Sequence, residues 1–177
     1  GWRRPVRSSG VGCKAAAKMR PCLLEQYIIR KRRGRQVPSL GVVGDVSADH
    51  RAHAQSGGIS SEVRFLGAID DEGLSEAYSE ALIYVLPSDE EGLSVAIQEA
   101  MASGLAIIST DCGGPSTIVQ PGRTGLLTPV GDAAAMAAAI DQLLSDEQAT
   151  SAMGERCRGV AQDLFSRWRA GRVSVEA

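Results

Sequence analysis

The sequence predicts an α/β fold, in which a parallel sheet is flanked by helices. Short apolar runs alternate with segments of helical periodicity along most of the chain. The apolar runs end at glycine, proline or small polar residues, which is typical of the ends of strands. One segment, Leu82–Thr110, has the pattern of a complete strand–loop–helix–strand unit. Such a unit joins parallel strands, because a parallel connection needs a crossover that is usually helical.

This unit begins with an apolar run, Leu82–Leu86, rich in residues that favour strands. A proline and a serine stop the run, and an acidic turn follows at Asp89–Gly92. A helix is predicted to begin near Ser94, because a serine hydroxyl is a good N-cap. Gly104 stands in the position of a C-terminal glycine cap, and the apolar run Leu105–Ile108 is the next strand.

Before this unit we predict two helices and two strands. A helix is expected over Cys22–Arg33, where apolar residues recur at three- and four-residue spacing. Strands are expected at Leu40–Val43 and Val63–Leu66, and Asp70 or Asp71 is expected to cap the next helix. Strands and helices that alternate in this way indicate a Rossmann-like sheet.

After the unit the chain continues the same alternation. Asp111–Pro115 combines two glycines with a proline, so we expect a turn through which no helix or strand continues. A short strand is predicted at Gly125–Thr128, and Gly131 and Asp132 begin a helix with an apolar stripe. A further helix is expected from Asp146 to Phe165.

We divide the chain into an irregular basic segment (residues 1–10), a Rossmann-like domain (residues 11–165) and an irregular tail (residues 166–177). At 177 residues the chain can form one α/β domain with a real core. No apolar run approaches the length that spans a membrane. The four cysteines are scattered, which is typical of reduced thiols. We therefore expect a cytoplasmic domain.

The charge of the chain is uneven. Residues 1–36 hold eleven lysines and arginines and one acid, whereas the remainder holds eight basic and twenty acidic residues. Such a basic arm can bind nucleic acid or a membrane, and a solvated helix face is the simpler interpretation. No aromatic residue is interleaved with the basic residues of Arg30–Arg35, which disfavours stacking on single-stranded bases. The pattern makes no strong case for a nucleic-acid partner.

Two histidines, His50 and His53, stand three residues apart, a spacing that suits a metal pair on one helix face. No further histidine or cysteine lies nearby in the sequence. We therefore interpret both as solvent-exposed side chains and expect no metal held by the protein.

The loop of the central unit has the features of an anion site. In open parallel sheets, ligands bind at the carboxyl ends of strands, where loops meet helix N-termini. The amides around Leu93–Val95 lack intrahelical acceptors, and Gly92 lets the backbone approach a ligand. Glu91 lies in the loop and Glu99 about one turn into the helix. Because a carboxylate can accept two hydrogen bonds from a diol, the pattern predicts a ligand that carries both phosphate and sugar hydroxyls.

Residues 91–104, EGLSVAIQEAMASG, resemble the E-x7-E motif of retaining glycosyltransferases of the GT-B fold. The most similar group is family 4, the glycosyl transferases group 1. The flanking segments agree with that family: VRFLG at 63–67, TDCGGP at 110–115 and GRTGLL at 122–127. The ordered set extends from about Leu40 to Asp132. It resembles the C-terminal, nucleotide-sugar-binding half of a GT-B fold.

The resemblance implies a role for each part of the motif. Glu91, the catalytic candidate, would bind hydroxyls of the donor sugar near the anomeric carbon, and Glu99 would hold the ribose hydroxyls. The diphosphate would be stabilised by backbone amides of Gly92, Leu93, Ser94 and Val95. The alternatives are a solvated Glu91 and a salt-paired Glu99.

The resemblance also implies contacts from outside the motif. Lys18 falls on the family's phosphate-binding lysine, with a plain surface lysine as the alternative, and Cys13 stands where the family has an arginine. The backbone of Ala68 and Ile69 would flank the base, unless it is only a strand end. The glycine pair, Gly113 and Gly114, would admit the donor's sugar or phosphate, unless it is only a structural turn.

The substrate implied is a UDP- or GDP-linked sugar, with no cofactor. Because the resemblance covers only the donor-binding half, the acceptor would be held by an N-terminal domain or a partner chain. Peripheral contact of the full-length enzyme with a membrane is also conceivable. Two further readings are a non-catalytic nucleotide-binding or interaction module, and a nucleotide-sugar epimerase of the same architecture.

Overall fold

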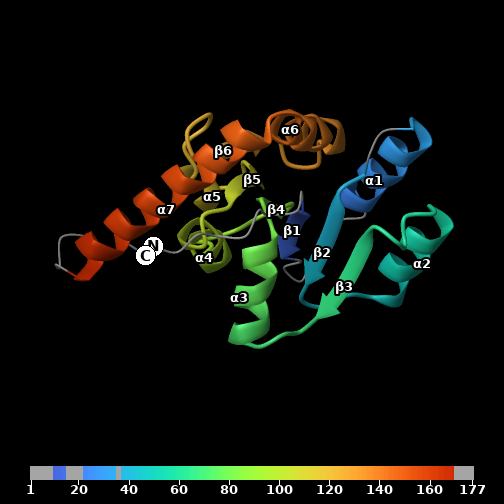
Figure 1. The fold of residues 1–177 in the computed structure, drawn as a ribbon, viewed down its shortest axis with the longest axis horizontal. Coiled ribbons are helices and arrows are strands. Elements are labelled where there is room, and N and C mark those ends of the chain that lie inside the picture. The colour runs from blue at the N-terminus through green and yellow to red at the C-terminus, as the bar shows by residue number, and fades with distance from the viewer. Residues whose placement is uncertain (1–9, 15–21, 35–36, 170–177) are drawn as a thin grey trace.

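The computed structural model describes residues 10–14, 22–34 and 37–169, and Figure 1 draws the other residues as a thin grey trace. Within these ranges six parallel strands form one sheet in the order β3-β2-β1-β4-β5-β6. The predicted α/β class with a parallel sheet is confirmed. The strands are β1 (Gly10–Lys14), β2 (Ser39–Val43), β3 (Val63–Gly67), β4 (Ile83–Leu86), β5 (Ala106–Thr110) and β6 (Gly125–Thr128).

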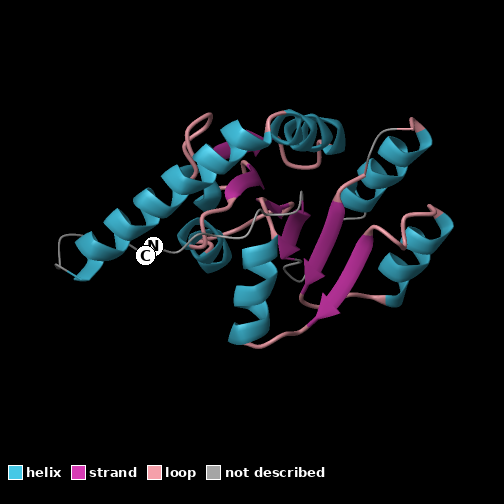
Figure 2. Cartoon of the chain, in the orientation of Figure 1, coloured by secondary structure: helices cyan, strands magenta, loops and turns pink. Residues whose placement is uncertain are grey.

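Helices cover both faces of this sheet (Figure 2). One apolar cluster joins the sheet to α1, α2 and α6, and a second cluster joins it to α3, α4 and α5. The last helix, α7, contributes side chains to both clusters. The helices are α1 (Cys22–Arg32), α2 (Ala48–Ser56), α3 (Asp71–Glu80), α4 (Val95–Ala102), α5 (Gly114–Ile118), α6 (Ala133–Ser145) and α7 (Glu147–Arg169).

Strand β4 shows why the central apolar run has no polar interruption. Ile83 and Val85 belong to the first cluster, and Tyr84 and Leu86 to the second. Successive strand side chains point to opposite faces, so a strand covered on both faces must be apolar throughout. All four side chains are buried.

The strand order reverses between β1 and β4, which are neighbours in the middle of the sheet. Chain segments leave these two strands in opposite directions across the sheet, so their loops diverge at the carboxyl edge. In doubly wound sheets this switch point is where ligands bind. The loop after β4, residues 87–94, therefore lies at the expected ligand edge, whereas the loop after β1 lies outside the described residues.

Two segments differ from the predicted boundaries at the ends of the domain. Helix α7 continues through Ser166–Arg169, which we expected to be irregular. Extending a formed helix costs far less than starting one, so the docked part of α7 lets its last turn propagate. At the other end Gly10 opens β1, although we assigned it to the irregular segment, because the strand pairs with both β2 and β4.

The glycine-rich turn at Asp111–Pro115 leads into a short helix, α5, that we did not predict from the sequence. Helix α5 begins at Gly114, inside this segment, and no helix or strand continues through it, as expected. Pro115 occupies the first turn of α5, where its missing N–H is not needed and its fixed φ already suits a helix.

Helix α7 lies tightly against the end of α4, the helix that carries the E-x7-E segment. A side chain at Gly154 would place its Cβ 2.2 Å from the carbonyl oxygen of Gly104. The Arg158 guanidinium donates to the carbonyls of Ala102 (3.2 Å) and Ser103 (2.9 Å), at the C-terminal end of α4 where helix carbonyls need partners from outside the helix. Helix α7 therefore determines where the C-terminal end of α4 sits.

We predict opposite effects of the same substitution at two glycines of α7. Gly154→Ala lowers the free energy of unfolding by about 1–3 kcal/mol, because its Cβ overlaps a backbone carbonyl that must move. Gly159→Ala is the control: it points into open space and raises stability by up to about 1 kcal/mol through helix propensity. Urea unfolding of both variants measures the difference, and equal effects would contradict the close α7–α4 contact.

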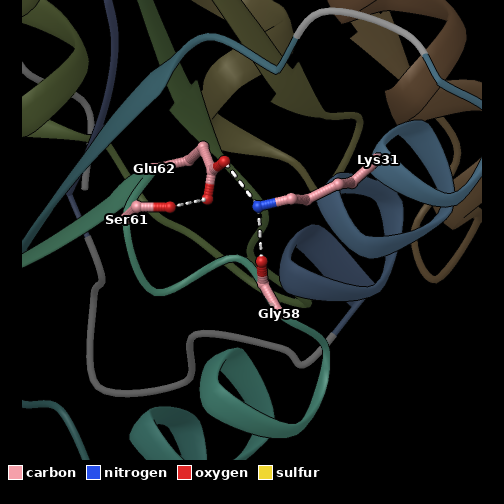
Figure 3. Close-up of polar contacts among 4 residues, drawn as sticks. All are labelled: Lys31, Gly58, Ser61 and Glu62. Carbon is pink, nitrogen blue, oxygen red and sulfur yellow. Dashed lines mark hydrogen bonds and ion pairs between the residues drawn. The ribbon is translucent and has the colours of Figure 1, made fainter.

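A polar cluster ties the end of α1 to the loop before β3 (Figure 3). The Lys31 ammonium donates to the carbonyl of Gly58 (2.5 Å) and pairs with the Glu62 carboxylate (2.7 Å). Ser61 donates to the second Glu62 oxygen (2.8 Å). The hydrogen bonds from Lys31 and then Ser61 lower the pKa of Glu62 below its ordinary value of 4.5.

This pair should stabilise the fold only where Glu62 is ionised. Lys31→Met is expected to lower the free energy of unfolding at neutral pH by less than about 1 kcal/mol, because the pair is partly solvated. A lowered folded-state pKa means that the contribution is complete above the unfolded value and is lost as pH falls below 4.5. Denaturant unfolding at several pH values tests this. The control, Arg32→Met, should show no such pH dependence.

Candidate functional site

The N-terminal end of α4 forms the expected capped helix start. Ser94 is the N-cap, and its hydroxyl accepts a hydrogen bond from the Ile97 amide (3.4 Å). The next two amides, of Val95 and Ala96, have no acceptor within the helix. Because the Ser94 hydroxyl is buried and engaged in the cap, only the amides of this end are available to an anion.

The backbone of Glu91 is held by the glycine-rich loop after β5. The Glu91 amide donates to the carbonyl of Cys112 (3.4 Å), and the Gly114 amide donates to the carbonyl of Glu91 (2.9 Å). A Cβ at Gly114 would lie 1.7 Å from the Gly92 carbonyl oxygen. The two loops, which we call the acidic loop (residues 89–92) and the glycine loop (residues 111–114), therefore interlock. The structure brings together the predicted residues Glu91, Gly92, Gly113 and Gly114.

The Glu91 side chain is half-buried and has a protein partner that sequence reasoning missed. The Ser88 hydroxyl donates to Glu91 Oε2 (3.1 Å), and the Thr110 hydroxyl donates to the Ser88 carbonyl. Both hydroxyl residues are buried at the ends of β4 and β5. The only signal in the sequence is that each is a polar residue at the end of an apolar run.

Glu99 lies on the side of α4 that faces α3. Burial raises the pKa of the Tyr78 hydroxyl on α3, and the neighbouring negative charge of Glu99 raises it further. The ring of Tyr78 packs edge-on against Tyr84 of β4, with centroids 5.9 Å apart. Tyr78 therefore stays protonated beside the Glu99 carboxylate, which is half-buried. This neighbour, too, is not evident from the sequence.

The remaining predicted residues lie further from Glu91 or outside the described ranges. Leu93 and Val95 are strongly exposed apolar side chains at the tip of α4, with 59% and 63% of their surface accessible. Ala68 and Ile69 follow β3 at the same edge of the sheet, but β2 and β1 separate that strand from β4. Lys18 lies outside the described residues.

A small hollow adjoins the acidic loop on the side of α6. Asp132 at its rim is the N-cap of α6 and accepts from the Ala135 amide (2.9 Å). The hollow thus places a second helix start close to the ends of β4 and β5. It is lined by Pro87, Ser88, Asp89, Thr110, Gly131, Asp132 and Met136.

Both histidines are half-buried, so the expectation that they are solvent-exposed is wrong, and His50 has a structural role. Nδ1 of His50 lies within hydrogen-bond distance of the Ser47 amide (3.3 Å) and hydroxyl (2.9 Å), and closes a capping box at the start of α2. Among the described residues, no cluster of three or more His, Cys, Asp or Glu side chains could hold a metal ion. No helix in the described ranges is long and apolar enough to span a membrane.

The chain is similar to known proteins in both sequence and fold. Residues 20–146, more than half of the chain, match the family model described as glycosyl transferases group 1. A GDP-mannose-dependent alpha-mannosyltransferase of Mycobacterium tuberculosis (strain CDC 1551 / Oshkosh) is 43% identical over 68 residues, which cover 38% of this chain and 18% of that protein. The chain spans only 18–27% of the length of this and two other curated relatives that it matches.

Two solved structures extend the likeness to nearly the whole chain. Sucrose-phosphate synthase from Thermosynechococcus elongatus superposes with a TM-score of 0.77 at 31% identity, over 92% of this chain and 42% of that one. The pneumococcal O-GlcNAc transferase GtfA, solved with UDP and GlcNAc, superposes with a TM-score of 0.76 at 22% identity, over 94% of this chain and 36% of that one. With its Rossmann-like parallel sheet and the family match over most of its length, the chain belongs to the glycosyl transferases group 1 family of GT-B glycosyltransferases.

Proposed function

We propose that this domain binds a nucleoside-diphosphate sugar and presents it for retaining transfer to an acceptor held by another domain or chain. The observation that carries the proposal is the interlock of the acidic and glycine loops, which holds Glu91 beside the open amides of α4. Both features lie at the carboxyl edge of the sheet, next to the switch point. Family membership supports the same activity.

The proposed diphosphate site is the N-terminal end of α4. Amides of Gly92, Leu93, Ser94 and Val95 surround this end, and Lys18 is the proposed neutralising cation. As the bond to the sugar breaks, negative charge grows on the diphosphate, and preorganised amides stabilise such charge without rearranging. The tip of the helix is suited to this role because its first amides have no acceptor of their own.

The proposed sugar and ribose sites use the two carboxylates. Glu91 would accept hydrogen bonds from donor-sugar hydroxyls and stabilise positive charge at the anomeric carbon, with Gly113 and Gly114 leaving room for the sugar. Glu99 would hold the ribose hydroxyls, and the backbone of Ala68 and Ile69 would flank the base. We propose no cofactor, because the charges of the transition state are met by amides, Lys18 and Glu91.

We propose that the nucleoside of the donor is either uridine or guanosine. GtfA was solved with UDP, and the mycobacterial relative is GDP-mannose-dependent. We also propose a cytoplasmic location, since Cys112 and Cys157 are free thiols and the cysteines are scattered in the sequence.

A second candidate is a non-catalytic nucleotide-binding module. It would hold a nucleotide with the same α4 amides and interlocked loops and catalyse no transfer. Because holding both reactants in one geometry supplies much of the rate of a transfer reaction, a donor domain alone would bind but transfer slowly. Donor-hydrolysis and transfer assays, with and without an added acceptor domain, separate the two candidates.

We predict that the two glutamates affect different parts of the donor. Glu99→Ala should weaken binding of both UDP (or GDP) and its sugar conjugates about tenfold or more, since it removes hydrogen bonds to a charged acceptor. Glu91→Ala should weaken only the sugar conjugates. Isothermal titration calorimetry measures both, after thermal-shift screening of nucleoside diphosphates identifies the base.

Glu90→Ala is the matched control, because Glu90 is an exposed carboxylate in the same loop. It should bind as the unaltered chain does. If the chain itself binds no nucleoside diphosphate, or if Glu99→Ala binds as tightly as the parent, the proposed function is wrong.

The interlocked loops generate a separate prediction. Gly114→Ala forces the acidic loop away from α5, because its Cβ would collide with the Gly92 carbonyl. We expect donor affinity to fall about tenfold or more, as overpacking displaces Glu91 and the α4 amides. The Gly159→Ala variant, with open space around its Cβ, serves as the control. Unchanged donor affinity in Gly114→Ala would show that the loops need not be interlocked for binding.

A further inference from the structure

The Glu91 carboxylate is restrained at one oxygen only. Ser88 Oγ donates to Oε2 at 3.1 Å, whereas Oε1 has no hydrogen-bond partner within the described ranges. The carboxylate is half-buried in the acidic loop, at the edge where the donor is proposed to bind. One oxygen is therefore engaged by the protein, and the other is available to a ligand.

Ser88 itself is held in place from the other side. It is buried, with 6% of its surface exposed, and its carbonyl accepts a hydrogen bond from the Thr110 hydroxyl at the end of β5. Ser88 lies two residues after the end of β4, a strand whose four side chains are all buried. The donor to Glu91 is thus attached to the rigid core and not to the exposed part of the loop.

The backbone of Glu91 is fixed as well, by its two hydrogen bonds to the glycine loop. With both backbone polar groups and one carboxylate oxygen engaged, Glu91 retains little rotational freedom. A group held in this way needs no reorganisation when a ligand hydroxyl arrives, which is the condition for strong transition-state stabilisation.

From these contacts we propose that Ser88 is a positioning residue, which orients the Glu91 carboxylate so that its free oxygen meets a hydroxyl of the donor sugar. This inference rests on the proposed function. It adds that the Ser88 hydroxyl acts only on the sugar part of the ligand, through Glu91, and not on the nucleotide part.

The test compares ligands with and without the sugar. Calorimetry on the full chain measures the dissociation constants of UDP, GDP and their glucose, N-acetylglucosamine and mannose conjugates. For each base, we define the sugar increment as the dissociation constant of the nucleoside diphosphate divided by that of its sugar conjugate. Ser88→Ala should reduce the sugar increment about tenfold, while the constant for the nucleoside diphosphate changes by less than about twofold.

Ser109→Ala is the matched control. Ser109 is a buried serine in the adjacent strand whose hydroxyl donates to the carbonyls of Leu86 and Thr110 and not to Glu91. It should leave the sugar increment unchanged. A loss of affinity for both ligand types in Ser88→Ala would indicate a merely structural hydroxyl and overturn the inference.

A double-mutant cycle tests whether Ser88 acts through Glu91. Glu91→Ala should abolish the sugar increment, and adding Ser88→Ala should change nothing further. Additive losses would overturn the inference, because Ser88 would then contact the sugar directly or act elsewhere.

The outcomes separate this inference from the proposed function. If the unaltered chain binds nucleotide sugars and Ser88→Ala keeps the full sugar increment, only the role of Ser88 is wrong. If the unaltered chain binds a nucleoside diphosphate with no sugar increment, the inference also fails while nucleotide binding stands. If it binds neither ligand, both proposals fail.

Discussion

The site depends on a contact that only a residue without a side chain permits. Gly114 lies against the Gly92 carbonyl so closely that a Cβ would stand 1.7 Å from the oxygen. Its amide and the Cys112 carbonyl bind the two backbone polar groups of Glu91. Loops that follow two different strands, β4 and β5, are thereby joined into one rigid edge. Without this contact the acidic loop would be an exposed bend, free to leave the tip of α4.

The rest of the fold holds the two sides of that contact in register. Strand β4 is covered on both faces, so its carboxyl end, with Ser88, cannot shift relative to β5. At the C-terminal end of α4, α7 packs closely, with Gly154 against Gly104. Arg158 of α7 also donates hydrogen bonds to the carbonyls of Ala102 and Ser103. Contacts at both ends of α4 therefore fix the position and direction of its N-terminal end.

Most of the fold could be predicted from local signals. Ser94 as an N-cap and Asp70 as the cap of α3 both stand where the structure has them. The β6 strand has the predicted bounds, Gly125–Thr128. These features depend on the chemistry of a few neighbouring residues, which is why the sequence alone predicts them. The assigned boundaries are wrong at Gly10 and beyond Phe165, where pairing or docking with distant segments overrides the local pattern, and β1, α2 and α5 were not predicted.

The sequence alone determined the alternation of strands and helices, the capped start of α4, and the presence of two carboxylates eight positions apart at that start. Periodicity, capping and motif spacing are properties of adjacent residues, so they need no third dimension. Only the tertiary structure decided which residues contact one another at the site. Ser88 donates a hydrogen bond to Glu91, Tyr78 lies beside Glu99, and Gly114 packs against the Gly92 carbonyl. Each of the last two pairs joins residues about twenty positions apart, and Ser88 reaches Glu91 only because the acidic loop folds back against the sheet. Such contacts arise when strands that are distant in the sequence pair side by side, which the order of the residues does not reveal.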